Sequence, residues 1–140
     1  MDIFTSMEIN SSGMSAERKR MNLISSNIAN ARTTRTEEGG PYKRKDAVFQ
    51  ATPMPELSPE EAKEAPGVTL AQIKEDTSAP KLEYDPTHPD ANPEGYVSYP
   101  NISVVEEMVN MITATRSYEA NAQSVQSAKD MARKALSIGA

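Results

Sequence analysis

The chain contains one group of residues whose types could bind a metal ion. His88 is the only histidine, and Asp85 and Asp90 lie close to it in the sequence. Imidazole nitrogens and carboxylate oxygens are common zinc ligands. The spacing fits no established zinc motif, and three prolines interrupt residues 85–95. We therefore expect His88 to be a turn residue, and we predict no metal ion and no cofactor.

Catalysis by side chains alone is also disfavoured. A serine or threonine nucleophile needs a neighbouring base, and only His88 could serve as one. Glu60, Glu61 and Glu64 crowd together, but they suit the solvated face of a short helix that Ser58 would cap. The chain has no glycine-rich phosphate loop and no nucleophile elbow. We predict that it is not an enzyme and has no small-molecule substrate.

The charge pattern argues against a nucleic-acid partner. Lys43, Arg44 and Lys45 form a basic cluster, but no aromatic residues are interleaved with them. Residues 46–107 hold three basic and thirteen acidic residues, and the net charge is -5. We expect the basic cluster to be a solvated surface and predict no nucleic-acid binding.

Two long helices are the elements that would have to position any functional residue. All ten prolines lie between Pro41 and Pro100, so both flanks lack the residue that breaks helices. The flanks also repeat apolar residues every seven positions, which is typical of helix-to-helix seams. We predict helices over about 3–31 and from about 101 to 137, with Asn101 or Ser103 as the second N-cap. Asn27 and Asn30 should end the first helix in left-handed or turn geometry.

The apolar stripes on these helices are thin. Asn10 and Glu17 occupy seam positions, and Gly13 weakens the middle of the first helix. The first helix therefore fits either an ordinary amphipathic helix of a small domain or a helix that orders only on assembly. We predict an assembly interface formed by Met7, Met14, Met21, Ile24, Ile28, Val104, Met108, Met111, Tyr118, Val125, Ala132 and Leu136.

The middle of the chain reads as a small β-containing unit. Residues 42–50, 68–74, 81–84 and 96–99 have strand character, and residues 51–67 read as a loop with the short helix inside it. The predicted fold is mainly α, with two long terminal helices packing as a coiled-coil-like pair around a proline-rich, irregular middle. The expected segments are 1–31, 32–100 and 101–140.

Composition limits the remaining possibilities. Hydrophobic residues make up 37% of the 140 residues and aromatic residues 5%, so a core that holds the whole chain rigidly is not expected. The sequence has no cysteine and therefore no disulfide. No apolar run reaches the roughly 18 residues of a membrane span. Polar residues such as Asp2 and Glu8 interrupt the N-terminus, so we expect no cleaved signal peptide.

Three motifs resemble the bacterial flagellar rod–hook axial family. The first is SSNIAN at residues 25–30, followed by TTRTEEGGPYKRK. The second and third are YDPTHPDANPEGYVSYPN at 84–101 and MITATRSYEANAQ at 111–123, which point to a protein of the proximal rod. The motif residues that the resemblance assigns are Asn27, Ile28, Ala29, Asn30, Ser117, Tyr118, Glu119, Ala120 and Asn121.

The resemblance implies a structural subunit of the basal-body rod, the periplasm-spanning drive shaft that transmits motor torque. It implies partnership with other rod proteins, with copies of the same chain and with ring or rod-adaptor proteins at the rod base. It also implies export through the flagellar type III apparatus without a cleaved signal, and a location in the periplasmic part of the basal body. The alternative that the residues leave open is a soluble helical adaptor or export chaperone that binds a partner's amphipathic helix.

Overall fold

A computed structural model of the chain describes residues 3–53 and 65–138. Its first element is the helix α1, Ile3–Ala29. The Asn30 side chain ends this helix by donating to the carbonyl of Ser26 at 2.9 Å, and Thr33 donates in turn to Asn30 Oδ1. Asn30 lies in a turn after the helix, which is one of the two predicted geometries. The left-handed alternative is not used, because no non-glycine residue described has a positive φ. Asn27 remains inside the helix.

The second long helix is α3, Val104–Ile138. Ser103 is its N-cap, since its hydroxyl accepts a hydrogen bond from the backbone N–H of Glu106. Glu106 and Glu107 lie in the first turn, where acidic groups favour the helix dipole. Both predicted helices are therefore present, and each ends within two residues of its expected C-terminal boundary.

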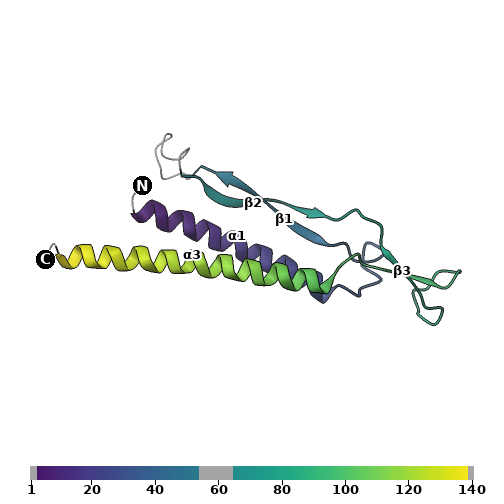
Figure 1. Ribbon diagram of the computed structural model, residues 1–140. Coiled ribbons are helices and arrows are strands. Elements are labelled where there is room, and N and C mark those ends of the chain that lie inside the picture. Colours follow the sequence, from purple (N-terminus) through teal and green to yellow (C-terminus); the bar gives the residue numbers. More distant parts are fainter. Residues whose placement is uncertain (1–2, 54–64, 139–140) are drawn as a thin grey trace.

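The two helices pack side by side and run antiparallel (Figure 1). Near one end, Asn27 of α1 contacts Glu107 of α3. Further along, a Cβ atom at Gly13 would lie 2.9 Å from Nδ2 of Asn121, so the helices approach closely there. α1 has 27 residues and α3 has 35, and α3 extends past the start of α1 at the end of the molecule that holds both termini.

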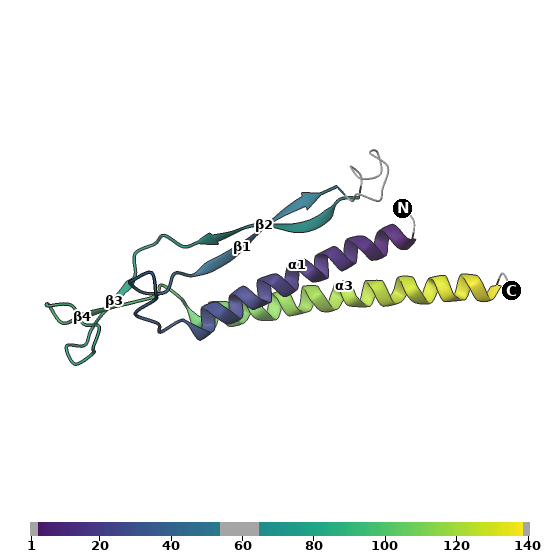
Figure 2. The ribbon, with the colours of Figure 1, turned by 180° about the vertical axis from the view of Figure 1, so that it is seen from behind.

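A β-hairpin covers the side of α1 that faces away from α3, as both ribbon views show (Figures 1 and 2). Its strands are β1, Lys45–Thr52, and β2, Gly67–Glu75, paired antiparallel with a register shift between Val48 and Phe49. The backbone N–H of Val68 donates to the Ser12 hydroxyl at 3.0 Å and ties β2 to α1. The strands extend into the predicted loop at residues 51, 52 and 67. The short helix expected at Ser58 lies outside the described residues.

A second two-stranded sheet projects from the end opposite the termini (Figure 2). It pairs β3, Lys81–Tyr84, with β4, Tyr96–Tyr99, in antiparallel register. Their sequence ranges agree with the prediction. The connecting loop folds on itself because Asp85 Oδ1 accepts from the N–H and hydroxyl of Thr87, and Asn92 Oδ1 accepts from the backbone N–H of Tyr96.

The buried core of the described residues is small. Its apolar members are Ala16, Ile24, Ala65, Val97, Ile102, Ala114 and Ala128. More than half are alanines, and each buries little apolar area. Three of these alanines, Ala16, Ala114 and Ala128, lie on the two helices and allow them to approach each other closely. The largest fully buried side chains include two polar ones, Asn27 and Glu107.

Candidate functional site

A buried polar cluster joins the two helices to the start of β1. Asn27 is fully buried, at 0% exposure, in the last turns of α1. Its Nδ2 donates to the carbonyl of Lys45 at 2.8 Å and to Oε2 of Glu107 at 2.9 Å. Its Oδ1 accepts from the Lys45 N–H at 2.9 Å and from the Tyr42 hydroxyl at 3.2 Å. The side-chain amide therefore uses its full hydrogen-bonding capacity.

Glu107 completes the cluster from the first turn of α3. The residue is 1% exposed, and its Oε1 accepts from Nε of Arg44 at 2.7 Å. Burial acts to lower the pKa of Arg44, but the hydrogen bond and the charge of Glu107 outweigh it, so the pKa is raised. The guanidinium also reaches Asp46 at 3.3 Å. We call Asn27, Tyr42, Arg44, Lys45 and Glu107 the polar junction.

The turn after α1 delivers Tyr42, Arg44 and Lys45 to the junction. The backbone N–H of Tyr42 donates to the carbonyl of Thr33 at 3.0 Å, which folds the intervening segment into a closed loop. Gly39 and Gly40 reverse the chain there with positive φ values that side chains rarely adopt. The chain then enters β1 directly beside Asn27. The asparagine therefore binds the backbone of a strand that begins 18 residues later.

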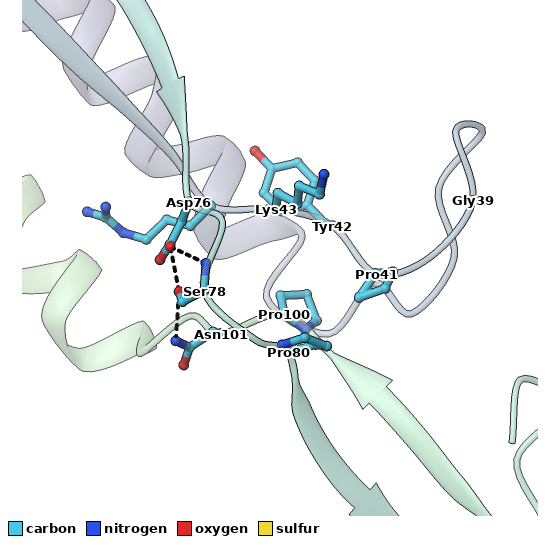
Figure 3. A pocket seen from close by; sticks show the side chains of 10 residues that line it. Gly39, Pro41, Tyr42, Lys43, Asp76, Ser78, Pro80, Pro100 and Asn101 are labelled. Carbon is cyan, nitrogen blue, oxygen red and sulfur yellow. Dashed lines mark hydrogen bonds between the residues drawn. The ribbon is translucent and has the colours of Figure 1, made fainter. Parts of the chain in front are cut away.

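A more exposed series of hydrogen bonds lies beside the junction. Ser78 donates to Asp76 through both its hydroxyl and its N–H, and Asn101 Nδ2 donates to the Ser78 hydroxyl at 3.2 Å (Figure 3). The bonds from Ser78 lower the pKa of Asp76. Pro41, Pro80 and Pro100 are among the residues that line a pocket next to these hydrogen bonds, as Figure 3 shows. These contacts connect the end of β2 to the segment that leads into α3.

The loop containing His88 is organised by local bonds. His88 Nδ1 accepts from the backbone N–H of Asp90 at 3.1 Å, so this nitrogen is engaged in the turn. The Asp90 carboxylate accepts from the Thr34 hydroxyl at 2.8 Å and lies 3.9 Å from Arg35. Hydrogen bonds from Thr87 lower the pKa of Asp85. Within residues 3–53 and 65–138, no group of three or more metal-ligating side chains could hold a metal ion. Glu60, Glu61 and Glu64 fall outside those ranges.

The residues predicted to form an assembly interface divide into two groups. Ile24 is buried, and eight others are half-buried on faces that the chain covers itself: Met7, Met14, Met21, Ile28, Met111, Tyr118, Val125 and Ala132. Three are exposed, namely Val104, Met108 and Leu136. Leu136 is 76% exposed, since α3 continues there past the start of α1.

The motif residues taken from the family resemblance also differ in their surroundings. Asn27 is buried in the junction, and Asn30 caps α1. Ile28, Ser117, Tyr118 and Asn121 are half-buried, whereas Ala29, Glu119 and Ala120 are exposed. The polar members of the first motif therefore have defined bonding roles inside the chain.

The sequence analysis missed two charged members of the junction. Arg44 was expected on a solvated surface and Glu107 only as a favourable first-turn residue, yet they form an ion pair with a 2.7 Å contact. The available signal was a second seven-residue series on α3, three positions after the series Val104, Met111, Tyr118 and Val125. Its members are Glu107, Ala114, Asn121 and Ala128. Three of these four residues are buried. A charged residue in such a series indicates a buried partner.

The arrangement joins segments that lie far apart in the sequence. Relatives explain why these segments matter. Residues 7–35 match the family described as "Flagella basal body rod protein", and residues 94–138 match "Flagellar basal body rod FlgEFG protein C-terminal". The Asn27–Glu107 bond thus connects the two matched segments.

Curated relatives match along the whole chain. The flagellar basal-body rod protein FlgC of Borreliella burgdorferi is 42% identical, with 99% of this chain and 98% of the relative covered. The chain belongs to the FlgC family of flagellar basal-body rod proteins. The FlgC proteins of Bacillus subtilis and Salmonella typhimurium are 40% and 37% identical, each over 99% of both chains.

FlgC-family membership decides between the two function classes that the sequence left open. The chain is a structural subunit of the flagellar basal-body rod, and the relatives give no support to an adaptor or export chaperone. None of the helices described is both long and apolar enough to cross a membrane.

Proposed function

We propose that the chain assembles with copies of itself and with other rod proteins into the proximal, periplasm-spanning part of the rod, which transmits motor torque. Ring or rod-adaptor proteins are its neighbours at the rod base. The flagellar type III apparatus exports it without cleavage of a signal peptide. Family membership supports the rod assignment. The exposed apolar surface of α3 supports the assembly mode.

That surface is the observation that carries the proposal. Val105, Met108, Val109 and Ile112 are all more than half exposed, and their spacing places them on one face of α3. The half-buried and buried residues of α3 lie on the opposite face, toward α1. After Ile112 the outward face becomes polar, with Arg116, Glu119 and Gln123 exposed. A contiguous apolar stripe with a polar continuation is typical of a protein-interaction site.

The far end of α3 supplies a second unpaired apolar surface. Met131, Leu136 and Ile138 are exposed there, and Phe4 is exposed near the start of α1. Leu136 lies four residues after Ala132, which ends the seven-residue series of Met111, Tyr118, Val125 and Ala132. Residues four apart share a helix face, so Leu136 lies on the side of α3 that faces the seam. At this end α3 extends past the start of α1 (Figure 1). A helix from a neighbouring subunit would cover this end.

The spacing of contacts supports coiled-coil-like packing of the terminal helices. Asn27 contacts Glu107, and Gly13 approaches Asn121. The two α1 positions are two heptads apart, and so are the two α3 positions, which is the repeat of a left-handed coiled coil. We extend this packing to neighbouring subunits and assign the interface to the twelve residues predicted from the sequence together with Val105, Val109 and Ile112. Segments 1–31 and 101–140 would form the inner helical layer and 32–100 the outer part.

An aspartate on the apolar stripe tests the proposal. Ile112→Asp should leave the free chain folded, because Ile112 is 55% exposed, but should abolish swimming in a flagellated strain that lacks its own FlgC. An unpaired charge buried between subunits costs several kcal/mol. Gln123→Asp is the matched control on the polar half of the same face, and it should swim normally.

Three measurements locate the defect. Circular dichroism reports folding, immunoblots of secreted protein report export, and electron microscopy of purified basal bodies reports rod assembly. We expect Ile112→Asp to fold and be exported but to yield no complete rods. Normal rods with Ile112→Asp would contradict the proposed assembly surface.

A further inference from the structure

The seam between α1 and α3 offers few features that would fix how far one helix slides along the other. The buried residues of α1 and α3 include Ala16, Ala114 and Ala128, whose side chains are alike and small. Gly13 gives room to the Asn121 side chain, whose flexible end lies 2.9 Å from where a Cβ atom of residue 13 would be. Alanines that recur at multiples of seven residues, such as Ala114 and Ala128, pack similarly after a slip of one heptad.

The polar junction is the place in this seam where a slip would be costly. In the observed register Glu107 accepts from both Asn27 and Arg44. Slipping by one heptad in one direction would bring Glu107 level with Arg20 and leave Asn27 without it. Slipping in the other direction would move Glu107 beyond the end of α1, toward Thr34. In both cases Arg44, which directly precedes β1, loses its ion pair with Glu107.

We infer that Glu107 determines the register of the α1–α3 pair, with Asn27 and Arg44 as its positioning partners. Buried polar residues specify register in other helix pairs because only one alignment satisfies them. Two of the bonds of Asn27 go to the backbone of Lys45 and involve no atom of α3. Asn27 Nδ2 and Arg44 Nε therefore form a pair of donors at one end of α1. Only the observed alignment of α3 places the Glu107 carboxylate against both of them. This concerns the chain's own helices and does not depend on rod assembly.

Thiol cross-linking of the purified full-length chain can measure the register. The sequence has no cysteine, so each introduced pair is unambiguous. Met21→Cys with Thr115→Cys reports the observed register, since these two side chains are 3.6 Å apart. Met21→Cys with Met108→Cys or with Ala122→Cys reports a slip of one heptad in either direction. A heptad is ~10 Å along the helix axis, so a short bifunctional maleimide separates the three alignments.

Substitutions at Glu107 then test the inference. Glu107→Leu removes the charge-assisted bonds but supplies apolar area to the seam, so the helices should stay paired. The ratio of observed-register to slipped cross-links should fall by about tenfold or more. Glu107→Gln keeps one acceptor oxygen but places an NH₂ group opposite either Asn27 Nδ2 or Arg44 Nε. The ratio should therefore fall less than in Glu107→Leu. Glu106→Ala is the matched control, because it removes a carboxylate from the same turn outside the junction, and it should leave the ratio unchanged.

Each outcome bears on the inference. An unchanged ratio in Glu107→Leu with helicity retained by circular dichroism would overturn it. If Glu107→Leu fails to fold, Glu107→Gln decides, and an unchanged ratio there would also overturn it. No register preference in the chain with native Glu107 would show that the register is not set within the chain. A lower ratio in both Glu107 variants, with the larger fall in Glu107→Leu and with Glu106→Ala unaffected, supports the inference.

Discussion

The two ends of the α1–α3 pair are built differently. At one end buried Asn27 and Glu107 and half-buried Arg44 form a hydrogen-bonded cluster that joins both helices to the start of β1. At the other end Leu136 and Ile138 are exposed, and α3 runs on without α1 beside it. The first end is held by bonds within the chain, whereas the second leaves apolar side chains exposed among the described residues. A rod subunit needs both, because it must hold its own shape and bind its neighbours.

The largest effect on stability should come from Asn27→Ala. The variant removes four hydrogen bonds and leaves the N–H and C=O of Lys45 without their side-chain partner. Each buried polar group left unpaired costs about 1–3 kcal/mol, so the free energy of unfolding should fall by about 3 kcal/mol or more. Urea unfolding followed by circular dichroism measures this. Asn22→Ala, an exposed asparagine of the same helix, should change it by less than about 0.5 kcal/mol.

Arg44→Ala should have a smaller effect of about 2 kcal/mol. It leaves the Glu107 carboxylate buried with Asn27 as its remaining partner, and a hydrogen bond to a charged group is worth about 1.5–3 kcal/mol. Lys43→Ala is the matched control, since Lys43 is exposed and adjacent in sequence. Equal unfolding midpoints for the two variants would contradict the role that we give to the ion pair.

Leu136→Asp should leave the stability of the free chain nearly unchanged, because the side chain is 76% exposed. It should nevertheless reduce incorporation into rods, because it places a charge on the surface that a neighbour covers. Ser137→Asp is the control at the next position. Unfolding experiments and quantification of the subunit in purified basal bodies separate the two effects. Full incorporation of Leu136→Asp would show that this end needs no partner.

The smallest effect concerns the pH dependence of stability that arises in the loop between β3 and β4. Hydrogen bonds from Thr87 hold the pKa of Asp85 below its usual range. Because the folded-state pKa is depressed, the stabilisation from this group is present above the unfolded-state pKa of about 3.9 and is lost as pH falls through the folded value. A carboxyl NMR titration should give a midpoint below about 3.9. Thr87→Val should raise that midpoint, and an unchanged value would remove the hydroxyl as its cause.

The elements could be predicted from sequence because their signals are local. Proline placement separates the helices from the middle, and alternation identifies β2. The polar junction could not be predicted in this way. Glu107 lies 63 residues from Arg44 and 80 from Asn27, and nothing local pairs them. Asn27 had the signature of a helix-end residue, and only the return of the chain through Tyr42 places a strand beside it.

The apolar stripe on the outward face of α3 was only partly predicted. Met108 was assigned to the interface, but Val105, Val109 and Ile112 were not, because the seven-residue spacing drew attention to Met111 and Tyr118. Those two are half-buried inside the chain. A helix that packs on both its own chain and a neighbour carries two apolar faces, and a single stripe describes only one of them.

Hydrogen exchange, measured on the free chain and on the same chain in purified rods, tests the central claim most directly. In the free chain, amides of α1 and α3 near Asn27 and Glu107 should be protected, and protection should decline toward Ile3 and Ile138. In rods the terminal halves of both helices should become protected as well. Uniform protection along both helices of the free chain, or rapid exchange at the junction, would contradict the account.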